Sequence, residues 1–528
     1  MKKLVKLIAL CCVLCISASM FACGKKDDSG SDTSPGAKLS EGIVDIIFSL
    51  TGELDDYEFV QEEINNSLHD DGKPYSVKFH FIDESNYTTQ LALKAGEGYD
   101  LAFIHYKYFS SCMQSGVLKD ATPYLNAFGS ELLNNTPSYA WKAVESGGKY
   151  YAIPRNMPVS DNDRVVAARK DWLESFGMTD IKTEQDLDKY FAGVYSMYEK
   201  EVREGIREKN SSYVYCADNH YTFLLREYCP SFYFPIMDYA FMPVYIDLDP
   251  EAKEDGKYVV KNYFESDEFL DLITKTRSYY NQGYISENDI SGSENYFNYG
   301  LLGMCWSTLF KTTERIENFK SATKNASPDA FIYDIYLNPD DDRYIVQGYE
   351  NAMALLDGSK MPNEAVDFLN WIRSSQKNYD LVCYGIENRN YKLTADGKLD
   401  FTGIPNGLRY ADKMPYWAFN DIRYQRYSKL LSDEYIDHLK NWDTADNIVV
   451  SPLAGFSPDF SSVTISSALA NVQAASSAMT QLVDGRVDPR EVVGGKTRIQ
   501  AIRDTVKTAG IDTLIAELQK QVDKFLGQ

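Results

Sequence analysis

Alternating strand and helix patterns near the start of the chain constrain its fold more than any other feature. Apolar runs and period-two alternation indicate strands, whereas apolar residues spaced three and four apart indicate helices. These patterns follow one another as strand 43–48, helix 57–68, strand 77–81, helix 88–95 and strand 99–104. Short parallel strands joined by crossover helices form a doubly wound sheet, and the carboxyl ends of such strands line a ligand crevice. The sequence therefore predicts an α/β fold with a binding site at that edge.

The overall composition is that of a large globular protein with an acidic surface. The 528 residues are 44% hydrophobic and 25% charged, which excludes a disordered or collagen-like chain. Lys and Arg number 54 against 77 Asp and Glu, giving a net charge of −23. So negative a surface repels phosphate backbones and anionic lipid, so nucleic acid and direct adsorption to a membrane are not expected.

The N-terminus carries the features of an export signal. Three lysines within the first six residues precede an apolar stretch that ends at Ala22 and is too short for a comfortable membrane span. Residues 1–22 are therefore interpreted as a signal peptide. Ala22-Cys23 resembles a bacterial lipobox, which implies that Cys23 is acylated and anchors the protein to the extracytoplasmic face of the cell membrane. Residues 23–41 are polar and without periodicity, and are interpreted as a flexible tether.

Five cysteines lie beyond Cys23, at irregular spacing: Cys112, Cys216, Cys229, Cys305 and Cys383. An odd number leaves at least one thiol free, and the spacing fits no disulfide framework. We therefore expect buried, reduced cysteines.

Further elements are expected along the rest of the chain. Pro154 and Pro158 favour extended backbone, as in a connection between two lobes. An apolar strand is expected to end at Trp306, and another short strand at 345–348. Helices are expected to begin near Pro362 and to fill 511–526, where an apolar stripe recurs at helical spacing.

Motifs of several enzyme classes are absent or incomplete. Gly494-Gly495-Lys496-Thr497 resembles part of a phosphate loop, but Arg490 stands where that motif needs glycine. The five histidines include no HExxH pair, and no G-x-S-x-G element is present. The acidic turn 338–342 lacks the spacing of a calcium loop and is interpreted as solvated. No catalytic residue, metal or cofactor is predicted.

A series of short motifs, taken in order, resembles a known family. The series comprises Gly147-Gly148-Lys149-Tyr150-Tyr151-Ala152-Ile153-Pro154, Arg169-Lys170-Asp171-Trp172-Leu173, Pro362-Asn363-Glu364-Ala365 with Phe368-Leu369-Asn370-Trp371, and Gly485-Arg486-Val487-Asp488-Pro489. Together with the lipobox, this order is similar to the extracellular solute-binding lipoproteins of ABC transporters, of the carbohydrate type. The resemblance implies a two-lobed, periplasmic-binding-protein-like (Venus flytrap) fold with a hinge and C-terminal helices.

The resemblance also implies a function and a division of the chain. The function is capture of a sugar or oligosaccharide between the lobes and its delivery to an ABC permease, by a monomer that is not an enzyme. The expected first lobe comprises 42–153 and about 346–430, and the second 154–345 and about 431–528. A surface glycoside hydrolase and a peptide-binding receptor remain as alternatives.

Candidate ligand-binding residues are those that follow strand ends at the expected crevice: Thr51, Glu53, His105, Tyr106, Arg155, Trp306, Tyr349 and Glu350. The aromatic ones would stack on the apolar faces of sugar rings, and Glu53, Glu350 and Arg155 would hydrogen-bond hydroxyl groups. Trp172 and Trp371 lie on expected helices and are interpreted as packing residues.

Overall fold

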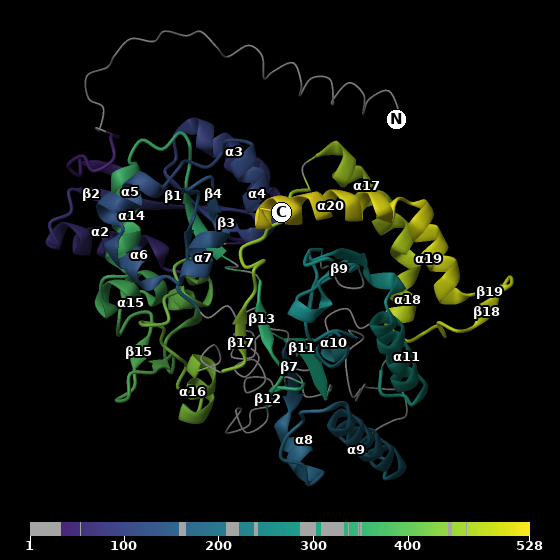
Figure 1. The fold of residues 1–528 in the computed structure, drawn as a ribbon. Coiled ribbons are helices and arrows are strands. Elements are labelled where there is room, and N and C mark those ends of the chain that lie inside the picture. The colour runs from purple at the N-terminus through teal and green to yellow at the C-terminus, as the bar shows by residue number, and fades with distance from the viewer. Residues whose placement is uncertain are drawn as a thin grey trace, which may run out of the picture.

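The computed structural model places two lobes beside each other (Figure 1). It describes residues 33–52, 54–157, 165–206, 221–236, 241–285, 303–307, 332–335, 337–346, 348, 351–441, 446–460 and 462–527. Among these residues there are two separate hydrophobic cores. The first is drawn from residues 44–153 and 352–419, and the second from 166–346 and 453–522.

A five-stranded sheet forms the centre of the first lobe, with the order β2-β1-β3-β14-β6. Its strands are β1 (Gly42–Ser49), β2 (Tyr75–Ile82), β3 (Leu101–His105), β6 (Ile153–Pro154) and β14 (Asn351–Leu355). β1 pairs in parallel with both β2 and β3, across the crossover helices α2 (Tyr57–Asp70) and α3 (Tyr87–Glu97). The strand and helix alternation predicted for the first hundred residues is confirmed.

β14 was not predicted, and it is antiparallel to both of its neighbours, β3 and β6. The strand expected at 345–348 is wrong in position. The structure instead has β13 (Arg343–Ile345), which pairs in parallel with β17 (Ile448–Val450) and does not join the central sheet.

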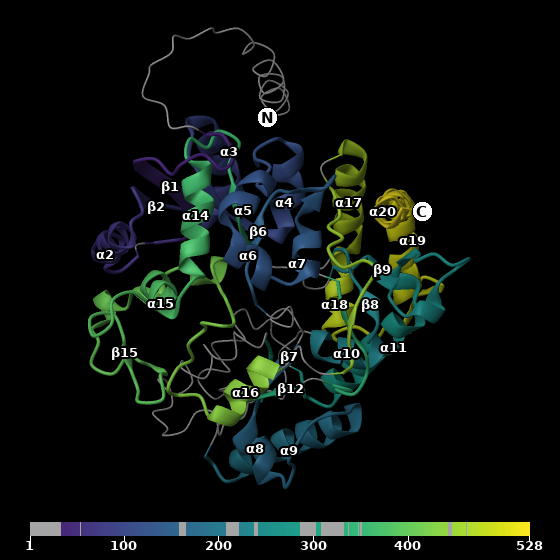
Figure 2. The same ribbon diagram turned by 60° about the vertical axis from the view of Figure 1, so that its left-hand side comes forward.

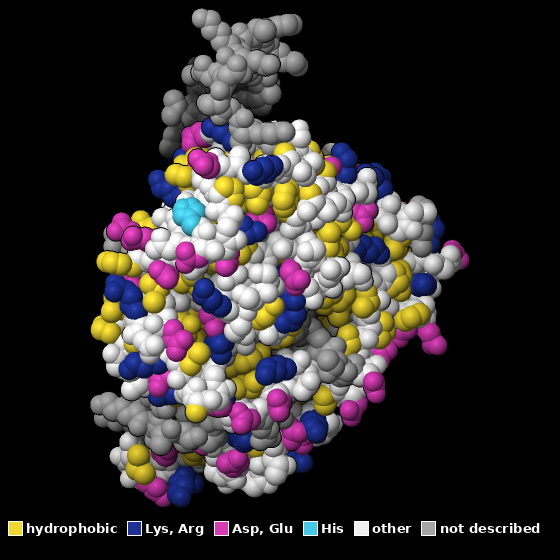
Figure 3. Space-filling view, turned by 90° about the vertical axis from the view of Figure 1, so that its left-hand side faces the viewer, with side chains coloured by type: hydrophobic (Ala, Val, Ile, Leu, Met, Phe, Trp, Pro, Cys, Tyr) yellow, Lys and Arg dark blue, Asp and Glu magenta, His cyan; other side chains and the backbone are white. Residues whose placement is uncertain are grey.

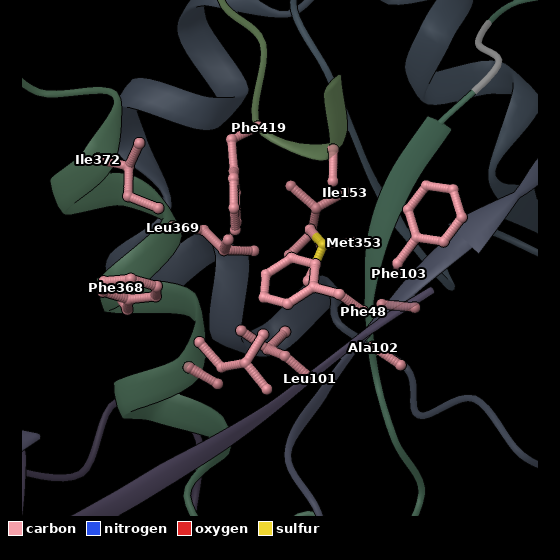
Figure 4. Packing of buried hydrophobic residues seen from close by; sticks show 14 of the residues in the cluster. Phe48, Leu101, Ala102, Phe103, Ile153, Met353, Phe368, Leu369, Ile372 and Phe419 are labelled. Atoms are coloured by element: carbon pink, nitrogen blue, oxygen red, sulfur yellow. The ribbon is translucent and has the colours of Figure 1, made fainter. Parts of the chain in front are cut away.

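Helices cover this sheet and complete its core: α4 (Tyr106–Gln114), α5 (Thr122–Phe128), α6 (Ser130–Asn135), α7 (Ser138–Ala143), α14 (Pro362–Ile372) and α15 (Gln376–Tyr384). α14 begins at Pro362 as predicted, because proline is favoured in the first turn of a helix. Its Leu369 points toward Met353 of β14 and Phe48 of β1 (Figure 4). The Phe48 ring also makes an edge contact with Phe419, at 5.4 Å between centroids.

Shorter elements extend the first lobe: the hairpin β4 (Glu145–Ser146) and β5 (Lys149–Tyr150), and the pair β15 (Lys392–Leu393) and β16 (Leu399–Asp400). The helix α16 (Asp433–Asn441) follows them and contributes to neither hydrophobic core. On the face in Figure 3, Lys and Arg side chains are interspersed with Asp and Glu. That face carries no continuous basic patch of the kind that a nucleic-acid backbone needs.

Two three-stranded sheets lie in the second lobe. β7 (Val165–Arg169) lies between β11 (Met304–Ser307) and β12 (Ile332–Ile335), and pairs antiparallel with both. The other sheet has the order β10-β9-β8 and is also antiparallel, with β8 (Phe232–Tyr233), β9 (Val244–Asp247) and β10 (Val260–Asn262). Parallel strands joined by crossover helices were expected in both lobes. Among the described residues, only the sheet of the first lobe has this arrangement.

Helices make up the rest of the second lobe: α8 (Lys170–Ser175), α9 (Glu184–Arg203), α10 (Leu225–Tyr228), α11 (Asp267–Asn281), α17 (Val463–Ala475), α18 (Met479–Val483), α19 (Arg498–Thr508) and α20 (Ile511–Leu526). A hairpin of β18 (Val492–Val493) and β19 (Lys496–Thr497) precedes α19. The predicted C-terminal helix is confirmed, and its apolar stripe is buried at Leu514, Leu518 and Val522. In Figure 2, α17 and α20 stand beside α4 and α7 of the first lobe.

Two further predictions from the sequence, the free cysteines and the flexible tether, can be compared with the structure. Cys112, Cys229, Cys305 and Cys383 are free and buried, as expected, whereas Cys216 lies outside the described residues. The described residues contain no helix that is long and apolar enough to span a membrane. The tether prediction needs correction over 33–41, because hydrogen bonds fix this segment to the first lobe.

Candidate functional site

The strand ends of the first lobe meet at one edge of its sheet. Within the register, His105 at the end of β3 is opposite Asn351 at the start of β14, and Ala352 is opposite Pro154. Arg155, which directly follows β6, therefore lies on the other side of Asn351 from His105. This edge, defined by the end of β1, His105, Asn351 and Arg155, is the candidate ligand edge.

His105 and Tyr106 form an aromatic step at the candidate ligand edge. His105 is the N-cap of α4, and its Nδ1 accepts a hydrogen bond from the Lys107 backbone N–H at 3.2 Å. A neutral imidazole held in this way carries its proton on Nε2. The His105 and Tyr106 rings are 4.6 Å apart between centroids, and Tyr106 is half-buried against the first core. Aromatic groups so placed can stack on the face of a sugar ring.

The other predicted residues differ in exposure. Thr51 is exposed just beyond β1, and its side chain hydrogen-bonds Asp83 at the end of β2. Hydrogen bonds from Ser85 and then Thr51 lower the pKa of the Asp83 carboxyl. Arg155 is only 6% exposed. In this state its guanidinium is part of the interior, so contact with a ligand would require the surrounding segment to move.

Four of the predicted residues cannot be placed by their side chains. Glu53, Tyr349 and Glu350 lie outside the described residues. Trp306 is described through its backbone alone, which pairs with Val166 near the start of β7. The chain enters β7 from the crossing that begins after Arg155, so Trp306 lies at the edge of the second lobe where that crossing arrives. Trp371, by contrast, is a packing residue as expected, with its Nε1 donating to Asp71 Oδ2 at 2.7 Å.

A polar cluster around the buried side chains of Asn156, Arg373 and Asp421 lies where the chain leaves the first lobe, and no spacing rule in the sequence predicts it. Asn156 Nδ2 donates to Asp421 Oδ1 at 2.9 Å, and the Arg423 guanidinium donates to both oxygens of Asp421 through Nε and Nη2. Arg373 Nη2 donates to the Pro154 carbonyl at 2.9 Å, and burial lowers the pKa of Arg373. We call Asn156, Arg373, Asp421 and Arg423 the hinge cluster.

The hinge cluster joins the start of one crossing, at Asn156, to the segment 420–423 of the first lobe. The Asn156 backbone N–H donates to the Asn420 carbonyl at 2.9 Å, and the Ile422 N–H donates back to the Asn156 carbonyl at 2.8 Å. The chain beyond Ile422 stays on the first lobe, where Arg426 pairs with Asp380 and Lys429 with Asp400. Because a buried carboxylate is stable only with such donors, the cluster holds the start of the crossing at Asn156 against the first lobe.

The helix α7 touches both the segment that connects β13 to β14 and the second lobe. A side chain at Gly348 would put its Cβ 2.5 Å from the Ala143 Cβ, and one at Gly455 would put it 2.7 Å from the Ala143 Cα. Real Cβ atoms essentially never come so close, so both positions need glycine for this contact. Lys142 lies over the Phe525 ring of α20, at 5.2 Å to the centroid. We call the contact of α7 with Gly348, Gly455 and Phe525 the glycine pivot.

Two contacts of α4 lie near the glycine pivot. Ser110 Oγ donates to Ser457 Oγ at 3.2 Å. Tyr106 lies near Tyr233 of β8, and burial and then the nearby Tyr106 raise the pKa of Tyr233. Tyr233 is thus a second-lobe aromatic residue beside a predicted site residue, and sequence spacing could not have revealed it.

An arginine occupies the acidic turn at 338–342. Arg226 donates to the carbonyl oxygens of Asp341 at 2.8 Å and Asp342 at 3.0 Å, and Asn447 Nδ2 donates to the Pro339 carbonyl at 2.8 Å. The carbonyls that a calcium loop would turn toward its ion are therefore bonded to side-chain donors. Within the described part of the chain, no group of three His, Cys, Asp or Glu side chains could hold a metal ion.

Comparison with known proteins identifies the fold. A family described as a domain of unknown function, DUF3502, matches residues 452–527, which include α17 to α20. No curated protein is similar enough in sequence to count as a relative.

Solved structures match nearly the whole chain. The N-glycan transport solute-binding protein NgtS from Streptococcus pneumoniae is 17% identical with a TM-score of 0.68, over 92% of this chain and 99% of that one. A human-milk-oligosaccharide (HMO) binding, ABC-transporter-associated protein from Bifidobacterium longum infantis is 13% identical with a TM-score of 0.60, over 92% and 99%. The fold is therefore that of the two-lobed, periplasmic-binding-protein-like solute-binding proteins, as predicted.

Proposed function

We propose that this protein is the substrate-binding component of an ABC importer, which captures an oligosaccharide between its lobes and delivers it to a permease. The observation that carries the proposal is the likeness of the whole two-lobed chain to NgtS, together with a candidate ligand edge that faces a hinge. NgtS has been solved with Man1GlcNAc and with Man5GlcNAc, and another similar structure, FusA from S. pneumoniae, with kestose. All three ligands are neutral, and a chain of net charge −23 suits neutral ligands better than anionic ones.

The mechanism we propose is closure about the hinge cluster and the glycine pivot. A ligand that contacts both lobes stabilises the closed arrangement only through contacts that the open arrangement lacks. The TM-score is 0.68 to the NgtS structure described without a ligand, and 0.61 and 0.57 to the two glycan complexes. This order supports an open arrangement of the lobes in the structure described here.

The proposed binding residues are those predicted from the sequence, in roles that follow from their chemistry. Trp306, Tyr106 and Tyr349 would stack on sugar rings, and His105 and Thr51 would stand beside them at the edge. Glu53, Glu350 and Arg155 would hydrogen-bond hydroxyl groups. The proposed lobe boundaries are 42–153 with about 346–430, and 154–345 with about 431–528.

We further propose that the protein acts outside the cytoplasm as a monomer without enzymatic activity. The basic and apolar N-terminus with Ala22-Cys23 supports a cleaved signal peptide and a lipid anchor on Cys23. Cys23→Ser should then release the protein from the membrane fraction or leave it as an uncleaved precursor. A variant that is cleaved yet resists salt washing would contradict the anchor.

A thermal-shift panel tests the proposed function. Mannose-containing N-glycans, milk oligosaccharides, fructo-oligosaccharides and a set of peptides would each be added to the soluble protein. A ligand that binds only the folded state raises the melting temperature, and the stabilisation grows with the logarithm of one plus its concentration over Kd. We expect an oligosaccharide to raise the melting temperature and the peptides to leave it unchanged. A shift with peptides alone would favour a peptide receptor, and chromatographic detection of cleaved sugars would favour a glycoside hydrolase.

A further inference from the structure

A carboxylate that was not among the predicted site residues lies at the end of β2. Asp83 directly follows Ile82, the last residue of that strand, and is exposed like the neighbouring Thr51 just beyond β1. Its Oδ1 accepts hydrogen bonds from the Ser85 backbone N–H, at 3.0 Å, and from the Ser85 hydroxyl. The Thr51 side chain makes a further hydrogen bond to the same carboxyl. These donors hold an exposed charged group in a fixed position.

The strand register places Asp83 at the candidate ligand edge. The parallel pairing of β1 with β2, continued by one residue past the end of β1, puts Leu50 level with Asp83. The parallel pairing of β1 with β3, continued in the same way, puts Leu50 level with His105 on its other side. Asp83 and His105 are therefore two strand spacings apart, which is about 10 Å. A disaccharide unit can span this distance.

The local structural role of Asp83 does not need its charge. Asp83 is the N-cap of the short 3₁₀ helix Glu84–Asn86, and a cap needs only an oxygen that accepts a hydrogen bond. Asparagine is as good a cap as aspartate. The hydrogen bonds from Ser85 and then Thr51 nevertheless lower the pKa of the Asp83 carboxyl, which favours its ionised form. The charge is thus left for a role beyond the cap.

We propose that Asp83 is a specificity-determining residue of the candidate ligand edge, which accepts hydrogen bonds from sugar hydroxyls and excludes sugars that carry a carboxylate there. This inference rests on the proposed function. An ionised carboxylate has about four acceptor positions and no donor, so it can take a ligand hydroxyl besides the donors of Ser85 and Thr51. A ligand carboxylate at the same place has no proton to donate and is repelled.

The candidate ligand edge then has an aromatic end and an acidic end. A sugar ring that stacks on His105 and Tyr106 brings the next ring of the same chain to Asp83, because the two ends lie about 10 Å apart. A hydrogen bond to a charged acceptor is stronger than one to a neutral acceptor, so the charge of Asp83 adds to the affinity for a neutral oligosaccharide. An oligouronate carries a carboxylate on every ring and cannot keep all of them away from Asp83.

Asp83→Asn tests the inference, because it removes the charge and keeps the size and the cap. Asp488→Asn is the matched control. Asp488 is also exposed, and its Oδ1 also accepts the backbone N–H two residues on, from Arg490 at 2.8 Å. It precedes β18, which lies on the side of the second lobe away from the first (Figure 1). The affinity of the full chain is measured by calorimetric titration with Man5GlcNAc and kestose, as neutral probes, and with tetramannuronate, as an anionic probe, beside ligand-free melting curves.

We expect Asp83→Asn to bind the neutral probe about five- to tenfold more weakly than the parent, and to bind tetramannuronate more tightly than the parent. Its ligand-free melting temperature should match that of the parent, and Asp488→Asn should bind as the parent does. Parent affinity for the neutral probe in Asp83→Asn, or an equal loss in Asp488→Asn, would refute the role of Asp83 and leave the proposed function standing. Tetramannuronate binding to the parent as tightly as the neutral probes would refute the exclusion. A parent that binds neither neutral probe would count against the proposed function and Asp83 together.

Discussion

Asn156 and Asp421 lie 265 positions apart in the sequence and are joined by a buried hydrogen bond of 2.9 Å. Asn156 lies where the chain leaves the first lobe after β6, whereas the chain beyond Asp421 stays on that lobe through Arg426 and Lys429. Rotation of the second lobe against the first is therefore expected beyond Asn156 on this crossing.

Asp421→Asn should weaken the first lobe substantially. The substitution removes the charge that the Arg423 guanidinium pairs with, while Asp421 itself is fully buried. Breaking a buried ion pair costs about 3–5 kcal/mol, and partial exposure of Arg423 reduces this to about 2 kcal/mol or more. Urea unfolding measures the loss. Asp396→Asn, at an exposed carboxyl that pairs with Lys398, should leave the free energy of unfolding nearly unchanged; equal losses in the two variants would contradict a structural role for the cluster.

Gly348→Ala tests the glycine pivot. Gly348 does not have a positive φ, so alanine meets only the clash with Ala143 and the Tyr139 carbonyl. Overpacking of this kind costs about 1–3 kcal/mol. We expect the contact between the lobes to loosen, with a larger radius of gyration in solution scattering. Gly407→Ala is the control, because nothing lies within 4 Å of its added Cβ. If both variants scatter like the parent, the pivot does not hold the lobes together.

The sequence could predict what local periodicity determines. The helix from Tyr57 and the strand from Leu101 were found because their apolar spacing repeats within a few residues. β14 was missed because Asn351-Ala-Met-Ala-Leu is short, and its place between β3 and β6 depends on pairing with residues about 200 positions away.

The same limit applies to the candidate functional site: residues set by local patterns could be predicted, and residues set by distant partners could not. His105 and Arg155 were predicted because they follow expected strand ends, and the sheet places them on either side of Asn351. Tyr233 and the hinge cluster could not be nominated, since their partners come from distant segments and follow no spacing rule. The tether prediction failed over 33–41 for a related reason: a polar, aperiodic segment looks flexible until buried acceptors such as Glu364 are known.

Asp400 should contribute to stability that is lost in acid. Although burial alone would raise its pKa, hydrogen bonds from Lys429 and Thr402 lower the pKa of the Asp400 carboxyl to about 2. A carboxyl whose pKa is lower in the folded state stabilises the protein above pH about 4, and this contribution is lost as the pH falls from about 4 to 2. Asp400→Asn should flatten the decline in unfolding free energy over that window. Asp446→Asn, at an exposed carboxyl, should leave the decline as steep as in the parent; a parent-like slope in Asp400→Asn would contradict the assignment.

Trp306→Ala should weaken glycan binding without unfolding the protein. Loss of an aromatic stacking platform costs about 1–3 kcal/mol, by analogy with base stacking, or roughly 5- to 150-fold in Kd. Trp371→Ala is the contrasting variant, because a buried tryptophan of the core costs about 3–5 kcal/mol of stability when truncated. Calorimetric titration beside ligand-free melting curves separates the two. If Trp306→Ala binds the glycan with the affinity of the parent, or loses most of its ligand-free stability, Trp306 is a packing residue of the core and not a ligand-binding residue.

Small-angle scattering with and without a saturating oligosaccharide tests the central claim most directly. The glycan is the one that gives the largest shift in the thermal panel, at a concentration at least a hundredfold above its Kd. If the lobes close over it as rigid bodies, the radius of gyration falls while the circular dichroism of the backbone stays constant. An unchanged scattering profile at saturation, or release of shorter sugars during the measurement, would contradict capture by closure of the two lobes.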